Sequence, residues 1–271
     1  MVLPLKEDDT YLVLNERGFA EGGAEGFYRH DTRFLARYRL RLPEGFALLQ
    51  SRSPRPDRLV QDWARFQGPD GELFLRRTLL LSRGRVREEL RFQNLGPTPL
   101  EVAVGLEVVP SFQDLFQARG WHASTGEVPG FAYRSPDGVE QRVVLSPPLP
   151  PEGYRLFLPP RGEGVLGWEV TLVSPLEAEG TLPTYEAFLA AFPEGEGRWG
   201  EALSQALLDL RALLLATPEG PVPAAGIPWF VAPFGRDSLL TAFMLLPWGK
   251  EVARSVLRYL AKRQGAVWDP F

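Results

Sequence analysis

One short segment concentrates residue types that recognise sugars. The stretch AAGIPWFVAPFGRDSLLTA at residues 224–242 places Trp229, Phe230 and Phe234 close to the adjacent Arg236 and Asp237. Aromatic rings offer an apolar face to the C–H side of a pyranose, and an arginine and an aspartate donate to and accept from its hydroxyl groups. The alternative is a helix start, at which the rings are core residues and the arginine pairs with its neighbour or with a helix end. The chemistry alone supports both interpretations equally.

Other polar clusters are weaker candidates. Glu194, Glu196 and Glu201 lie in a glycine-rich loop and at a helix start, where solvated carboxylates are expected, so we reject them as a catalytic pair. The sequence HDTR at residues 30–33 has types suited to acid–base work, but a hydrogen-bonded turn between strands is the favoured interpretation. His122 could reach a sugar from a loop, although an exposed or hydrogen-bonded histidine is the commoner case.

The composition of the chain argues against several classes of function. The 271-residue chain has a net charge of -4 with both signs interspersed, which argues against a nucleic-acid partner, because such a partner requires clustered cations. It has no cysteine and two histidines, so we expect neither a thiol nucleophile, nor a metal site, nor a cofactor. The acidic amino end and the lack of a long apolar run predict a soluble, cytoplasmic protein with no membrane partner. The charged run RGRVREEL at residues 83–90 is most simply a solvated strand face without a functional role.

The elements that must position these residues follow two successive patterns. Up to about Leu182, apolar and polar residues alternate in short segments, which are separated by turn sequences such as GPDG at residues 68–71 and SPDG at residues 135–138. The clearest segments are residues 37–42, 72–82, 86–94 and 100–109, followed by QRVVLSP, YRLFLPP and GWEVTLVSP. Many short strands linked by tight turns predict a mainly β protein, with an antiparallel β-sandwich over residues 1–182.

After a linker over residues 183–198, the hydrophobic period becomes helical. Apolar residues that recur every three or four positions predict an amphipathic helix, carried by Leu203, Ala206, Leu207, Leu210, Leu213 and Leu214. A second helix is expected over residues 238–246, capped by Asp237, and a third over residues 250–263. Residues 199–271 would thus form a short α-helical segment.

The apolar stripes of these helices have too few partners within the chain. We expect an exposed apolar surface formed by the leucines of the first helix and by Val252, Val256 and Leu260 of the third. Because the chain ends on WDPF, we also expect that the rest of a helical domain is missing. The partners that follow are a separate chain that supplies the missing helices, or a second copy of this chain.

The segment at residues 224–242 resembles the opening of the catalytic domain in bacterial glycogen-debranching-like proteins, the amylo-α-1,6-glucosidase family. GFYRHDTRFLARYRLRL at residues 26–42 and DLFQARG at residues 114–120 resemble markers of that family's amino-terminal β domain. The resemblance implies a β-sandwich that leads into an (α/α)6 barrel of the glucoamylase type. It also implies that Arg236 and Asp237 bind the terminal glucose of an α-glucan, and that the catalytic acid and base lie farther along the barrel.

Three functions remain open from the sequence. The first is the amino-terminal part of a glucan-cleaving α-glucosidase that is inactive alone, with Arg236, Asp237, Trp229 and Phe230 as its substrate-binding residues. The second is a non-catalytic module, whose β domain binds an oligosaccharide or a protein partner. The third is a truncated gene product without activity. The first is favoured, and a fold resemblance by itself does not settle its chemistry.

Overall fold

The structure is a computed structural model, and it describes residues 2–66, 72–122, 130–135, 138–176 and 179–265. Contacts divide the chain into two units, which we call the sandwich unit (Met1–Pro175) and the helical unit (Leu176–Phe271). The turn expected at residues 68–71, half of that at residues 135–138 and the final WDPF lie outside the described residues. Each unit is considered by itself below.

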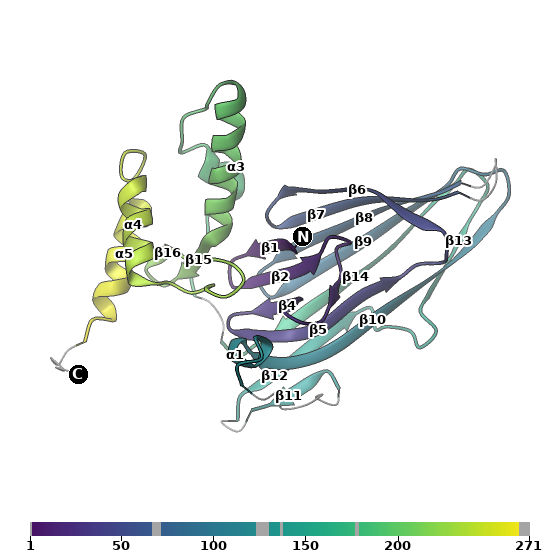
Figure 1. Cartoon of the computed structure of the whole chain (residues 1–271), viewed down its shortest axis with the longest axis horizontal. Helices are drawn as coiled ribbons and strands as arrows, with labels where there is room; N and C mark the ends of the chain where they lie inside the picture. Colours follow the sequence, from purple (N-terminus) through teal and green to yellow (C-terminus); the bar gives the residue numbers. More distant parts are fainter. Residues whose placement is uncertain (1, 67–71, 123–129, 136–137, 177–178, 266–271) are drawn as a thin grey trace. The chain divides into compact units, whose positions relative to one another are not determined.

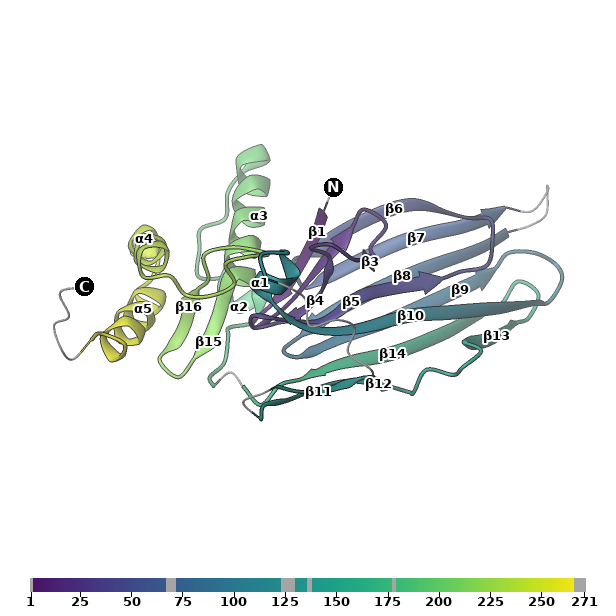
Figure 2. The same ribbon diagram turned by 60° about the horizontal axis from the view of Figure 1, so that its bottom comes forward.

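The sandwich unit consists of two antiparallel sheets, each of seven strands in the described part of the chain (Figures 1 and 2). In the first sheet the order is β1-β2-β4-β5-β10-β13, with β3 paired to β5, and the bounds are β1 Val2–Glu7, β2 Thr10–Asn15, β3 Ala20–Glu21, β4 Gly26–Arg29, β5 Thr32–Arg41, β10 Leu100–Asp114 and β13 Tyr154–Leu158. In the second the order is β11-β12-β14-β9-β8-β7-β6, and the bounds are β6 Phe46–Arg55, β7 Arg58–Phe66, β8 Glu72–Ser82, β9 Arg85–Asn94, β11 Ala132–Arg134, β12 Glu140–Ser146 and β14 Glu163–Val173. The predicted fold class, an antiparallel β-sandwich followed by helices, is confirmed.

The core of the sandwich unit follows from alternation within its strands. Along β9, buried residues occupy every second position, and the same period runs through the first half of β10. Successive side chains of a strand point to opposite faces, so each sheet presents one apolar face to the other. The large buried side chains come from both sheets and include Phe27, Phe34, Tyr38, Trp63, Phe92 and Trp168.

The interpretation of residues 83–90 as a solvated strand face is wrong for one of its charged residues, Glu88. Arg87 is exposed, but Glu88 is 1% exposed and shares the inward face of β9 with Val86 and Leu90. The period of two places Glu88 on that face, whereas residue type alone suggests a solvated position. A buried carboxylate therefore needs a partner inside the sandwich.

That partner is Arg77 on β8, whose side chain is fully buried. Its Nε lies 2.5 Å from Oε1 of Glu88, and its Nη1 donates to the backbone oxygen of Gly18 at 2.8 Å. The hydroxyl of Tyr38 donates to the other carboxylate oxygen of Glu88, and Nε1 of Trp168 donates to the Tyr38 oxygen at 2.6 Å. This chain of polar contacts links the two sheets through the middle of the core, because Tyr38 lies on β5 and the others lie on β8, β9 and β14.

The last part of β10 departs from regular pairing with β5. The register shifts on both sides of Pro110, which has no backbone N–H to donate, and Phe112 adopts a positive φ of 51°. Pairing resumes where Gln113 and Asp114 oppose Arg33 and Thr32. The HDTR turn and the start of DLFQARG, which are far apart in sequence, therefore lie side by side at one end of the first sheet.

The helical unit contains helices and one hairpin. Its elements are α2 Tyr185–Leu189, α3 Gly197–Leu213, β15 Leu214–Thr217, β16 Gly220–Pro223, α4 Gly235–Leu245 and α5 Glu251–Lys262. The short α2 lies within residues 183–198, and its first turn is capped by Thr184, whose hydroxyl accepts from the Ala187 N–H at 3.1 Å. Leu214, expected at the end of a helical stripe, instead begins the hairpin. None of the described helices is long and apolar enough to span a membrane.

The apolar stripes expected to lack partners are largely covered within the helical unit, so that expectation is wrong for these residues. Leu207 and Leu214 pack with Phe188 of α2, while Val252 and Val256 of α5 pack with the hairpin and with α4. The exposed apolar side chains lie mainly on α4 and just after it, where Leu240, Phe243, Met244 and Trp248 are 57%, 71%, 70% and 48% exposed. The hairpin and α2, which the sequence pattern did not predict, supply the covering surface.

Candidate functional site

The segment at residues 224–242 forms a closed loop followed by the first turns of α4. The loop is held by reciprocal backbone hydrogen bonds between Gly226 and Phe230, 3.0 and 3.1 Å long. The hydroxyl of Ser238, buried inside α4, donates to the backbone oxygen of Pro223 at 2.9 Å, which fixes the helix to the end of the hairpin. The loop is therefore short and tied at both ends, and it defines where the first turn of α4 begins.

Arg236 and Asp237 lie in this first turn. Helix α4 begins at Gly235, with Phe234 in the N-cap position and no side-chain cap, so the expectation that Asp237 caps the helix is wrong. The side chains of Arg236 and Asp237 are 85% and 42% exposed, and their Nε and Oδ2 atoms are 4.0 Å apart. A contact at this distance in solvent holds neither side chain firmly. Both groups can turn toward a ligand.

Helix electrostatics account for only one of the two charges. An acidic residue in the first turn interacts favourably with the helix dipole, so Asp237 has a structural explanation. A cation at the same helix end is disfavoured by the dipole, and the guanidinium of Arg236 is exposed. Stability of α4 therefore does not explain Arg236.

The aromatic residues of the segment lie at different depths. Phe230 and Phe234 are 51% and 44% exposed, and their rings meet edge to face with centroids 5.7 Å apart. Trp229 is half-buried. The segment thus combines an arginine donor, an aspartate acceptor and two partly exposed aromatic rings on one loop and helix start. These are groups that can bind sugar hydroxyls and a sugar C–H face.

Other carboxylates of the helical unit, three of them considered from the sequence, are exposed or paired with a cation. Glu194, Glu196 and Glu201 are all exposed, and Glu196 occupies the N-cap position of α3 without a side-chain capping bond. In the hairpin turn, Glu219 contacts the ammonium of Lys262 at 2.8 Å, which holds the pKa of its carboxyl below the usual value. A general acid for glycoside cleavage requires a raised pKa, so Glu219 is electrostatically unsuited to that role.

The first two residues of the HDTR sequence, His30 and Asp31, form the turn between β4 and β5. His30 has a positive φ of 50°, and its Nε2 lies 3.3 Å from Oδ2 of Asp9. The same carboxylate oxygen accepts from Nε of Arg29 at 3.0 Å, and Arg29 also donates to the backbone oxygen of Leu172 at 2.8 Å. Burial raises the pKa of the Asp31 carboxyl, and the charge of His30 opposes that rise. These contacts join the first sheet to β14 and give the turn a structural role.

His122 lies in a group of rings at the end of β10. It stacks on Phe116 of α1 (Leu115–Ala118) with centroids 5.5 Å apart. The sequence did not single out Phe116, although its spacing from Trp121 across a glycine indicates a short helix with a closed end.

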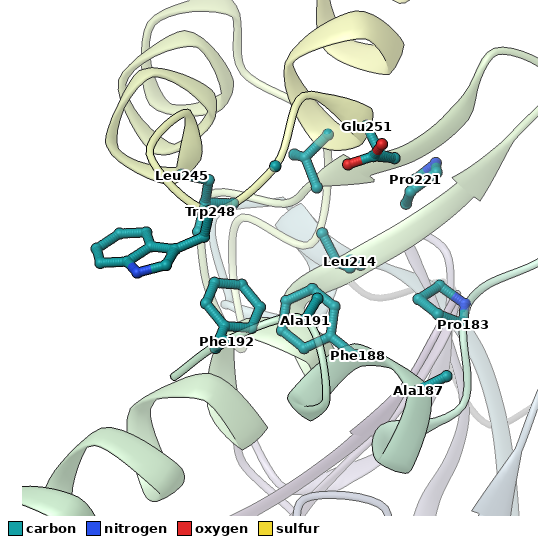
Figure 3. A pocket seen from close by; sticks show the side chains of 12 residues that line it. Pro183, Ala187, Phe188, Ala191, Phe192, Leu214, Pro221, Leu245, Trp248 and Glu251 are labelled. Carbon is teal, nitrogen blue, oxygen red and sulfur yellow. The ribbon is translucent and has the colours of Figure 1, made fainter. Parts of the chain in front are cut away.

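A pocket of about 230 Å³, partly open to solvent, lies in the helical unit between α2, β15 and the start of α5 (Figure 3). Its lining is mainly apolar: the rings of Phe188 and Phe192 lie along it, Trp248 lines one side, and Glu251 adds a carboxylate. Inverting hydrolysis requires two carboxylates about 6.5–9.5 Å apart, so this lining fits an apolar group and not a glucan undergoing cleavage. Among the described residues, no cluster of three or more metal-ligating side chains is found.

The fold defines a class of protein: an antiparallel β-sandwich module followed by a short helical unit. Residues 5–179 match the family model described as the N-terminal domain of some glycogen debranching enzymes. The chain belongs to this family. No curated protein matches the chain at a significant level. The match covers the β-sheet domain, for which the resemblance is confirmed, and it ends before most of the helical unit.

Proposed function

We propose that the chain is the amino-terminal part of a glycogen-debranching α-glucosidase, whose helical unit begins an (α/α)6 barrel. In this proposal Arg236 and Asp237 bind the terminal glucose of an α-glucan, and Trp229 and Phe230 contact its C–H face. The observation that carries the proposal is the exposed Arg236 at the amino end of α4, since helix stability does not account for it. The family of the preceding domain supplies the α-glucan context.

The catalytic acid and base are proposed to come from outside this chain. A barrel of this type uses one carboxylic acid to protonate the leaving oxygen and one carboxylate to activate water. The chain alone is therefore expected to release no glucose from maltose, isomaltose or limit dextrin. Glucose release that co-purifies with the chain and is lost in Asp237→Asn would contradict this division of labour.

A natural protein in which this chain continues into further helices is expected to be active. There, Asp237→Asn should reduce kcat/KM by at least about tenfold, because an acceptor for a sugar hydroxyl loses its charge. The matched control is Asp209→Asn, an exposed aspartate on α3. Equal activity of the two variants would remove Asp237 from the substrate site.

The exposed face of α4 is proposed to be the contact for the missing barrel helices or for a second copy of this chain. Phe243 and Met244 are 71% and 70% exposed on adjacent positions, which is unusual for large apolar side chains in a monomer. Light scattering of the chain is expected to give a dimer or larger species, and the double variant Phe243→Glu with Met244→Glu a monomer. A monodisperse monomer of the unchanged chain would contradict the self-association.

A further inference from the structure

The corner that follows β10 is locked at both ends. At its start, Asp114 accepts from the Gln117 N–H at 2.8 Å, and the Gln117 side chain accepts from the Asp114 N–H at 3.2 Å, which is a capping box. At its end, Gly120 adopts a φ of 75°, and the N–H groups of Gly120 and Trp121 donate to the backbone oxygens of Gln117 and Phe116 at 3.0 and 2.9 Å. These two bonds form a Schellman motif. A helix of four residues is thus held in one conformation.

This rigid corner presents three aromatic rings, which we call the aromatic platform: Phe116, Trp121 and His122. The Phe116 ring lies 5.9 Å from that of Trp121 and 5.5 Å from that of His122, with interplanar angles of 35° and 24°. Phe116 is 49% and Trp121 66% exposed, and His122 is also exposed. The guanidinium of Arg119 lies 4.8 Å from the centroid of the Trp121 ring, where it helps to hold the ring's orientation.

Local stability explains only part of this arrangement. A Schellman motif is often accompanied by an apolar contact between the two positions that Phe116 and Trp121 occupy. Such a contact can be made by aliphatic side chains and needs neither two large rings nor a third stacked beside them. The burial that would justify these rings is small, since about half or more of the Phe116 and Trp121 surfaces remain in solvent. Leu115, 8% exposed, is the buried residue of this short helix.

We propose that the aromatic platform is a binding site for α-glucan on the sandwich unit, additional to the proposed site at Arg236 and Asp237. The identity of the ligand rests on the proposed function, whereas the platform rests on its own geometry. Exposed rings on a rigid support stack against the C–H faces of successive glucose units with little loss of conformational freedom. The carboxylate of Asp114 is engaged in the capping box, so the platform holds glucan and does not cleave it.

Electrophoresis of the full chain through native gels with and without glycogen tests this site. We expect the unchanged chain to be retarded by glycogen, and Trp121→Ala to weaken the apparent affinity about tenfold, the upper range for one ring contact. Trp121→Phe should retain most of the affinity. The matched control is Trp199→Ala, because Trp199 is a tryptophan of the helical unit that is 86% exposed. Circular dichroism of each variant checks that the fold is kept.

Three outcomes would overturn the platform: no retardation of the unchanged chain, equal retardation of Trp121→Ala, or equal weakening by Trp199→Ala. A change of oligomeric mass in Trp121→Ala, with glycogen retardation unchanged, would assign the rings to a protein contact instead. Asp237→Asn distinguishes the two proposed sites. Loss of retardation with Trp121→Ala but not with Asp237→Asn supports the platform whatever becomes of the barrel site, and the reverse pattern rejects the platform alone.

Discussion

Each unit of the molecule contains an arginine that faces a carboxylate, and the two pairs differ in almost every physical respect. In the sandwich unit, Arg77 and Glu88 are both fully buried and 2.5 Å apart. In the helical unit, Arg236 and Asp237 are 85% and 42% exposed and 4.0 Å apart. Burial forces every charge of the first pair to find a partner, whereas solvent leaves the second pair free to exchange water for a ligand. The same two chemical groups are therefore part of the core in one unit and accessible to solvent in the other.

The largest expected effect comes from removing one charge of the buried pair. Glu88→Gln keeps the shape but leaves Arg77 uncompensated, and should lower the free energy of unfolding by about 3–5 kcal/mol. Urea denaturation followed by circular dichroism measures this change. The control is Glu89→Gln, the next residue of β9, whose 43% exposed side chain pairs with Arg91 at 3.4 Å and should contribute less than about 1 kcal/mol. Equal losses in the two variants would show that the buried pair has no special role.

The second-largest expected effect comes from the hydrogen bonds that the Tyr38 hydroxyl makes beside the buried pair. Tyr38→Phe removes the hydroxyl that donates to Glu88 and accepts from Trp168, and should cost about 1–3 kcal/mol of unfolding free energy. Burial, together with the charge of Glu88, holds the pKa of Tyr38 well above its ordinary value, so this hydroxyl stays protonated as a donor. Tyr154→Phe is the matched control, because Tyr154 stacks on the same tryptophan at 5.2 Å but makes only a long 3.4 Å hydrogen bond.

At the exposed pair, Arg236 and Asp237, we expect substitutions to change stability little and substrate binding more. Arg236→Ala should change the free energy of unfolding by less than about 0.5 kcal/mol, since surface substitutions away from caps and buried networks have small effects. In a protein that carries the whole barrel, it should raise KM for a malto-oligosaccharide about tenfold. Arg258→Ala, an exposed arginine on α5, serves as the control for both measurements. A large loss of stability in Arg236→Ala would show that Arg236 has a structural role.

The smallest expected effect is a dependence on pH. Lys262 and then Arg263 lower the pKa of Glu219, so the carboxylate stabilises the folded helical unit at pH values above its ordinary pKa near 4.5, and this contribution is lost as the pH falls through the lowered value. Glu219→Gln should therefore unfold at lower urea concentration than the unchanged chain at pH 6, and at a similar concentration near pH 3. Glu107, whose pKa is lowered by Arg41 and Arg37, gives the corresponding measurement in the sandwich unit.

The sequence patterns predicted the secondary structure of the sandwich unit more accurately than that of the helical unit, for a physical reason. In the sandwich unit, β8 and β9 were located almost to the residue, because alternation and turn residues are local signals. In the helical unit, α3, α4 and α5 were predicted, but the hairpin at residues 214–223 was not. Leu213 and Leu214 continue the helical period, yet α3 ends at Leu213, and Leu214 begins a strand and packs in a site beside Phe188. That site exists only once α2 and α3 are packed.

The candidate site residues also divide into features that the sequence identified and features that required the structure. The types and spacing in residues 224–242 identified Arg236 and Asp237 as polar groups worth testing, but their first-turn position and exposure required the start of α4 to be located. The ring group around Phe116 combines neighbours in sequence, and its exposure depends on how the chain leaves the sheet after Asp114. Sequence neighbours can be identified from the chain, whereas solvent access is a property of everything packed around them.

The sequence by itself determined the mainly β character of the first unit and the change to helices after it. It also identified residue types that are chemically able to contact a sugar. These features depend on local period and residue type. Only the tertiary structure decided that Glu88 is inside, that Arg77 is its partner from the neighbouring strand, and that Arg236 remains in solvent. Charges of identical type are distinguished by burial, and burial is set by contacts between segments that the chain brings together only on folding.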